Sequence, residues 1–156
     1  MTTHTARPVE PSVLKELRTA DDAGRTPSPF TAEEGGAPLR CCLRRSERGE
    51  RIALVSYAPL RRWAAETGAA PGAYDEQGPV FIHADECAGP ETDAFPFPGA
   101  HRTIRRYSAD GHILGGDLVP AVTDEALRNA FDDPSVALVH VRAVEYGCFH
   151  YEVRRP

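Results

Sequence analysis

The chain has 156 residues, 41% hydrophobic residues and a formal net charge of −5, which fits one domain with a hydrophobic core. The negative charge argues against nucleic acid as a partner, because nucleic-acid-binding domains usually carry a basic surface. No apolar run approaches the roughly 18 residues of a membrane helix. The N-terminus shows no secretory signal. We therefore expect a cytoplasmic protein with no membrane role.

The N-terminal part of the chain is polar and rich in Gly and Pro. We expect residues 1–37 to form a flexible segment with a possible short helix over Val13–Ala20, which Ser12 would cap. The remainder, residues 38–156, is expected to form a single domain.

The patterns within that domain predict short strands and helices. Leu39–Leu43 resembles a short extended segment, and Asp110-Gly111 is a strong turn signal between two strands. About six strands and two or three short helices predict an α+β fold with a mainly antiparallel sheet. In chain order the main elements are the strand Arg51–Tyr57, the helix Leu60–Thr67 opened by Pro59, the strand Val80–His83, the strands Arg102–Tyr107 and Ile113–Val119, the helix Asp124–Phe131 capped by Thr123, and a hairpin over Ser135–Arg155.

The C-terminal β-hairpin is the most strongly patterned stretch. A three-residue loop ending at Gly147 would place glycine where such loops need a left-handed residue. In that register Arg142 faces His150, Val141 faces Tyr151 and His140 faces Glu152. One face is then apolar, and the other collects the polar residues His140, Arg142, Cys148, His150 and Glu152.

This polar face is the first candidate site. Cys148 would be a nucleophile whose pKa is lowered by His140, His150 or Arg142, so these residues are candidates for acid/base or thiol catalysis. In the simpler alternative, Cys148 is a small hydrophobic residue that closes the hairpin, and the charged groups are solvated or paired with Glu152.

A polar or anionic small molecule is the ligand that this face would suit. Arg106 and Arg142 could together bind a carboxylate or phosphate, with Tyr74 supplying a hydroxyl and Cys42 adding to the site. The alternative is that these arginines form ion pairs with the many acidic residues. Arginine is abundant throughout, with Lys15 the single lysine among 18 basic residues, which is typical of a GC-rich bacterial genome.

A metal site is the second candidate. His83 and Cys87 lie four residues apart where a strand enters a loop, and Cys42, Cys148 or His150 could complete a tetrahedral zinc site. The chain has no paired Cys-x-x-Cys motifs, so a zinc ribbon or finger is not supported. Cys41 and Cys42 would point to opposite sides of an extended chain, so only one of them is expected in any given site.

The sequence contains no P-loop, dinucleotide-binding glycine motif, nucleophile elbow or His-Glu-x-x-His motif. Whether the protein is an enzyme is therefore left open. Three functions stay in view: binding or acting on a polar or anionic small molecule, binding zinc, and acting as a non-catalytic interaction module.

Several short stretches between residues 38 and 155 resemble DUF1203, a bacterial family of unknown function. They include Pro38–Leu43, Gly49-Glu50, Tyr74, Pro79–Phe81, Arg106-Tyr107, Val139–Arg142 and Gly147–Phe149. The resemblance implies one small bacterial domain and carries no established activity. Leu39 stands where members often have Cys, and Arg142 where some have His, so a His-x-His metal grip does not transfer to this chain.

Overall fold

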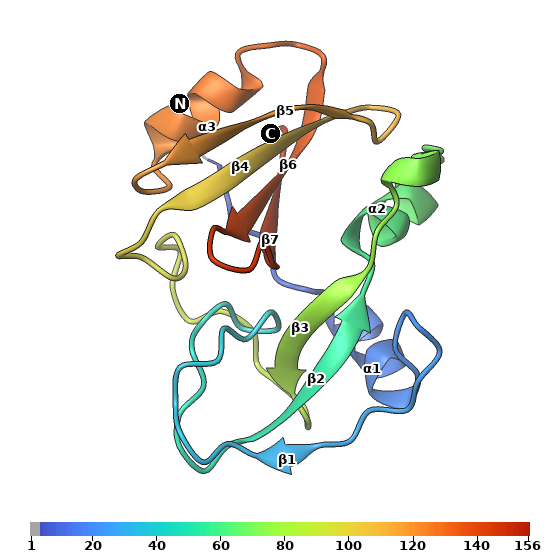
Figure 1. The fold of residues 1–156 in the computed structure, drawn as a ribbon, viewed down its shortest axis with the longest axis vertical. Coiled ribbons are helices and arrows are strands. Elements are labelled where there is room, and N and C mark those ends of the chain that lie inside the picture. The colour runs from blue at the N-terminus through green and yellow to red at the C-terminus, as the bar shows by residue number, and fades with distance from the viewer. Residues whose placement is uncertain (1–3) are drawn as a thin grey trace.

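The computed structural model describes residues 4–156, and Figure 1 shows their fold. Within this range the chain forms three α-helices, one 3-10 helix and seven strands, which confirms the expected α+β class. The elements are α1 (Pro11–Thr19), β1 (Phe30–Thr31), β2 (Arg51–Tyr57), α2 (Pro59–Thr67), η1 (Gly72–Tyr74), β3 (Gly78–His83), β4 (Arg102–Ser108), β5 (Ile113–Val119), α3 (Asp124–Phe131), β6 (Val136–Ala143) and β7 (Phe149–Arg154).

The strands form two antiparallel sheets, with orders β1-β2-β3 and β5-β4-β6-β7. In Figure 1 the four-stranded sheet lies above the three-stranded sheet, with α3 beside the former and α1 beside the latter. The sequence predicted the strands but not their division between two sheets. The extra strand, β1, is only two residues long and has no alternating pattern that would reveal it.

The N-terminal segment contributes to the core. Helix α1 begins at Pro11 and buries Leu14 and Leu17 against β2 and β3, and Val9 and Ala32 belong to the same cluster. Pro11 takes the first helical position, where a missing backbone N–H costs nothing. Ser12 therefore lies inside the helix and does not cap it.

The other two helices follow their sequence signals closely. Helix α3 has the expected bounds, and Thr123 Oγ1 accepts a hydrogen bond from the Ala126 amide at 3.1 Å. Helix α2 ends at Gly68, whose φ of +80° gives the left-handed C-cap that glycine favours. Helix α3 packs on the four-stranded sheet through three buried side chains, Leu127, Ala130 and Phe131.

The segment that carries the two adjacent cysteines is a tight turn. We expected Leu39–Leu43 to be extended, and that prediction is wrong. The Leu43 amide donates to the Leu39 carbonyl oxygen at 2.9 Å, and Leu43 itself has a positive φ of 57°. In this turn the Sγ atoms of Cys41 and Cys42 lie 4.0 Å apart, so the expectation that they point to opposite sides is also wrong.

The hairpin register is confirmed over most of its length and wrong near the turn. His140 pairs with Glu152 and Val141 with Tyr151, as expected. Arg142 then pairs with Phe149 instead of His150, because a β-bulge leaves His150 as the extra residue. The bulge brings Phe149 to the side of His140, where their ring centroids lie 4.9 Å apart.

The predicted left-handed position in the hairpin loop is confirmed, because Gly147 has a φ of +72°. Across residues 4–156, no helix has both the length and the apolar character needed to span a bilayer.

Candidate metal centre

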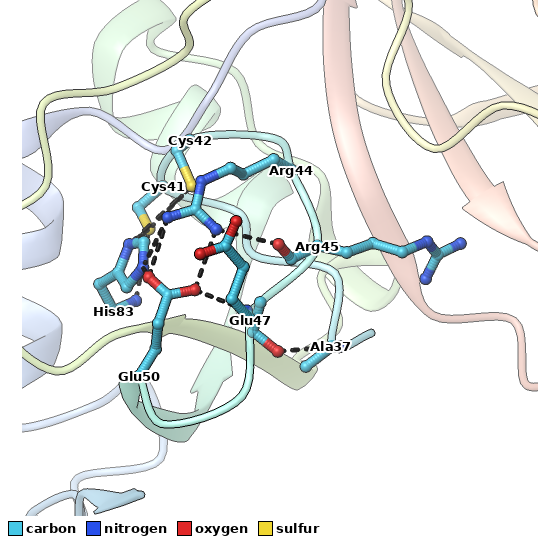
Figure 2. A network of polar contacts seen from close by, with 9 residues as sticks. Ala37, Cys41, Cys42, Arg44, Arg45, Glu47, Glu50 and His83 are labelled. Atoms are coloured by element: carbon cyan, nitrogen blue, oxygen red, sulfur yellow. Dashed lines mark hydrogen bonds and ion pairs between the residues drawn. The ribbon is translucent and has the colours of Figure 1, made fainter. Parts of the chain in front are cut away.

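Four potential metal ligands meet where the 39–43 turn passes the end of β3. They are Cys41 and Cys42 from the turn, His83 from the last position of β3, and Cys87 from the loop that follows. Their candidate ligand atoms all lie within 4.8 Å of one another. The predicted pair His83 and Cys87 is thus brought together with two thiols, and Figure 2 shows Cys41, Cys42 and His83 around one point.

The separations match a small tetrahedral metal ion. Zinc binds sulfur at about 2.3 Å and imidazole nitrogen at about 2.0–2.1 Å, so the ligand atoms of a tetrahedral site lie about 3.5–3.8 Å apart. His83 Nδ1 lies 3.3 Å from Cys41 Sγ and 3.9 Å from Cys42 Sγ. With the two sulfurs 4.0 Å apart, shifts of a few tenths of an ångström would give these three atoms regular zinc geometry.

The imidazole of His83 is held by a carboxylate on its far side. Its Nε2 lies 2.7 Å from Glu50 Oε2, so a proton on Nε2 leaves the Nδ1 lone pair directed at the thiols. Glu50 is itself held by Arg44, whose two terminal nitrogens each donate to one carboxylate oxygen at 2.9 Å (Figure 2). Metal-binding histidines usually have such an outer carboxylate, which sets the tautomer and strengthens the ligand.

A hydrogen bond within the cluster, helped by nearby charges, favours the thiolate form of one cysteine. The hydrogen bond from the Cys41 thiol, with smaller contributions from the Arg44 amide and the charges of His83 and Arg44, lowers the pKa of Cys42 to about 6. The same hydrogen bond, together with burial, raises the pKa of Cys41. The paired bonds from Arg44 hold the pKa of Glu50 well below its usual range, so this carboxylate is charged.

The cluster is enclosed on one side and accessible on the other. Cys41 and Cys42 are buried, whereas His83 and Cys87 are partly exposed. A cavity of about 370 Å³ adjoins the cluster and is lined by Cys42, His83, Cys87 and several acidic residues of the loop after β3. An ion therefore has an entry path from solvent.

The family comparison covers nearly all of the chain. The model of a family described as a protein of unknown function, DUF1203, matches residues 36–155. The chain belongs to the DUF1203 family. Comparisons with curated proteins and with solved structures found no match. The family description assigns no activity, so the function of this DUF1203 domain has to be argued from its own side chains.

The hairpin residues that we expected on one polar face are separated in the DUF1203 domain. His140 is only 1% exposed and lies between the rings of Tyr107 and Phe149, with its Nε2 3.6 Å from Glu152 Oε1. Burial lowers the pKa of His140. This side chain does not line the cavity that Cys148 and His150 line.

The bulge places His150 with Cys148 at a different location. Both residues line a cavity of about 490 Å³ where the hairpin meets β2 and β3. His150 packs against Phe97, with ring centroids 4.8 Å apart. Burial, followed by the charges of nearby arginines, lowers the pKa of His150 to about 3, so this imidazole is neutral at pH 7.

The remaining candidate ligand residues do not converge. Arg106 forms an ion pair with Asp117 at 2.9 Å, and Arg142 forms one with Glu76 at 3.1 Å. Tyr74 is 41% exposed, and its ring lies against that of His112. Cys42 belongs to the metal cluster and not to the hairpin site.

Three features of the sites were not predicted. Cys41 and Cys42 were not expected in the same site, because the turn that brings their sulfurs together includes Leu43 with a positive φ, and a leucine gives no signal for that conformation. Glu50 lies in a turn, where acidic residues are common. Arg40 and Arg102 have no sequence signal that distinguishes them from the other arginines, although both are buried.

Proposed function

We propose that this DUF1203 domain binds one zinc ion through Cys41, Cys42, His83 and Cys87. The observation that supports it is the pairing of a four-donor cluster with an imidazole already oriented by Glu50. A chance cluster of thiols would not require an outer carboxylate on the far side of its histidine, whereas a metal site commonly has one.

The donor set favours zinc. Thiolate and imidazole ligands suit zinc, and four protein ligands complete its tetrahedral coordination. Zinc sites with four protein ligands are structural in most proteins, because no position is left for water or substrate. In this domain the ion would connect the 39–43 turn, the end of β3 and the loop at residues 84–100.

The metal content of the purified protein tests this proposal. Full-length protein should be prepared without a polyhistidine tag and under reducing conditions. We expect about one zinc per chain by elemental analysis, as for other sites with four protein ligands. Zinc, iron and copper all well below one equivalent, in protein that also fails to take up added zinc, would overturn the proposal.

Cobalt substitution tests which residues bind. Tetrahedral cobalt(II) with thiolate ligands gives intense visible bands and a thiolate charge-transfer band in the near ultraviolet. The variants Cys87→Ser and His83→Asn should weaken or alter both features. Cys148→Ser removes a thiol outside the cluster and should leave the cobalt spectrum unchanged. Identical spectra in all three variants would place the metal elsewhere.

A second candidate function is the binding of a polar or anionic small molecule beside the hairpin, and the cavity next to Cys148 and His150 favours it. Its volume of about 490 Å³ falls in the range of small-molecule sites. Ligand-observed NMR with a fragment mixture of mixed charge should detect binding to the wild type. Leu54→Trp, at a half-exposed position on the cavity wall, should reduce this binding.

Catalytic roles for Cys148, His140 and His150 stay predictions, as does a cytoplasmic location.

A further inference from the structure

Three arginines line the cavity between the two sheets. Arg40 and Arg45 come from the turn region, and Arg102 comes from the start of β4. Among the residues that the structure describes, none of the three forms an ion pair with a carboxylate. Eight other arginines form such pairs and six do not, so a missing carboxylate matters most for Arg40 and Arg102, the two arginines that are buried in the described structure.

Two of these arginines are buried. Arg40 is 2% exposed and Arg102 is 4% exposed. Their side chains donate to main-chain oxygens: Arg40 to Phe149 at 2.8 Å and to Pro38, and Arg102 to Phe97 at 2.6 Å and to His101 at 2.9 Å. Carbonyl oxygens satisfy some N–H groups but carry no compensating charge. Buried charges are normally paired, because removing an unpaired ion from water is costly.

Further polar atoms at the cavity have no partner. Within residues 4–156, the buried Nε of Arg102 and Nδ1 of His150 make no hydrogen bond. The nearby Arg40, Arg102, Arg45 and Arg142 charges contribute, after burial, to a His150 pKa of about 3, and burial lowers the Arg40 pKa to about 10. The arginine contributions to the His150 shift show that positive charges gather at this cavity. Among the residues that the structure describes, Glu145 is the sole acidic residue that lines the cavity, and it forms no ion pair with these arginines.

The other walls of the cavity are largely apolar. They are formed by Pro38, Leu54, Pro79, Phe81, Ala100 and Ala143. Leu54 is 49% exposed on β2, so an apolar surface faces solvent beside the arginines. A ligand for this cavity would therefore join a negative group to an apolar body.

We propose that the cavity binds the carboxylate of a small molecule with an apolar body, through Arg40, Arg45 and Arg102. The proposal deepens the second candidate function and depends on it, but it does not rest on the zinc proposal. A guanidinium group matches a carboxylate in charge and planar geometry. One negative charge also suits these apolar walls better than the near-double charge of a phosphate monoester, which is more costly to remove from water.

Three small probes of similar shape test the ligand class. Phenylacetate carries the carboxylate, phenylacetamide is its neutral counterpart, and phenyl phosphate carries the alternative anion. Binding to the full-length protein should be measured by isothermal titration calorimetry. We expect phenylacetate to bind about tenfold or more tightly than phenylacetamide, since hydrogen bonds to a charged group contribute more than neutral ones.

Two exposed positions allow variants that should fold. Arg45→Gln should weaken phenylacetate binding by at least about fivefold, whereas Arg48→Gln removes the same charge from a turn outside the cavity and should not. Leu54→Asp should weaken binding through repulsion, whereas the uncharged Leu54→Asn should have a smaller effect. Circular dichroism would verify folding of each variant. Weaker binding in Arg45→Gln but not in Arg48→Gln, and a larger loss in Leu54→Asp than in Leu54→Asn, would support the carboxylate site.

Contrary outcomes distinguish failure of the carboxylate assignment from failure of the small-molecule function. If phenylacetate and phenylacetamide bind equally and Arg45→Gln matches the wild type, the cavity binds small molecules but the carboxylate assignment is wrong. If phenyl phosphate binds much more tightly than phenylacetate, the anion is a phosphate. If none of the probes and no fragment binds to the folded protein, both the carboxylate site and the small-molecule function are rejected.

Discussion

Glu50 Oε2 lies 2.7 Å from His83 Nε2, and this contact directs the other imidazole nitrogen toward two adjacent cysteines. The carboxylate would touch no metal, yet it would govern how well His83 serves as a ligand. The properties of the proposed zinc site should therefore depend on a residue outside the four ligands.

Replacing that carboxylate should weaken metal binding. We expect Glu50→Gln to lower zinc affinity by about 10- to 100-fold, the usual effect of losing an outer carboxylate. Competition with a chromophoric chelator measures the change. Glu34→Gln, at an exposed position outside the cluster, is the matched control. Equal affinities in the two variants would show that Glu50 does not support the metal ligand.

The buried histidine of the hairpin should make stability depend on pH. His150 has a folded-state pKa of about 3, compared with 6.5 for an unperturbed histidine. The unfolded chain therefore binds the proton first, so stability is fully present above pH 6.5 and is lost as pH falls toward 3. At pH 5 the loss from this residue is about 2 kcal/mol. His4 and His140, whose pKa values burial also lowers, act in the same direction.

Urea denaturation at pH 7.5 and pH 5 checks this prediction. The difference in unfolding free energy between the two pH values should shrink in His150→Asn. The same difference should persist in His101→Asn, because His101 is exposed. A wild-type pH response in His150→Asn would mean that His150 binds a proton equally well in the folded and unfolded states, which contradicts its lowered pKa.

The caps of two helices should respond differently to alanine. Thr123→Ala removes the hydroxyl that accepts from the Ala126 amide, and we expect a loss of about 1 kcal/mol in unfolding free energy. Ser12→Ala lies within α1 and away from its N-cap, so its effect should stay within about 0.5 kcal/mol. A larger loss at Ser12 than at Thr123 would contradict the observed helix starts.

The turn of the hairpin requires a left-handed residue. Gly147→Ala should cost about 1 kcal/mol, because alanine is strained at a φ of +72°. A Cβ at Gly147 or at Gly78 meets no atom within 4 Å, so the two positions differ in backbone conformation and not in available space. Thermal denaturation should show Gly147→Ala destabilised and Gly78→Ala unchanged or slightly stabilised. Equal melting temperatures would rule out the strained turn.

Local signals were sufficient to predict most elements of the fold. Thr123 as a cap, Gly68 as a stop and the alternation along β2 each act through neighbouring residues, so they can be read from the sequence. The bulge at His150 could not be predicted in this way. It depends on contacts with distant residues, including the bond from Arg40 Nε to the Phe149 carbonyl oxygen.

The metal cluster was predictable only where its ligands are close in sequence. His83 and Cys87 are close in sequence, and their four-residue spacing suggested a shared site. Cys41 and Cys42 reach that site only because residues 39–43 form a turn beside β3, where the Arg40 amide bonds to the Phe81 carbonyl oxygen at 2.9 Å. The arginine cavity likewise joins segments from five parts of the chain, and no short sequence pattern could predict that they come together.

Three consecutive residues, Arg40, Cys41 and Cys42, divide between the two proposed sites. The arginine side chain lines the cavity, and both sulfurs belong to the metal cluster. One short turn thus carries side chains that would bind a cation and a side chain that would bind an anion. A backbone shift that follows binding at one site would therefore move the binding groups of the other site. Thermodynamic linkage then requires that any factor by which zinc changes carboxylate affinity equals the factor by which carboxylate changes zinc affinity. If the turn couples the two sites in this way, each ligand would change the affinity of the domain for the other.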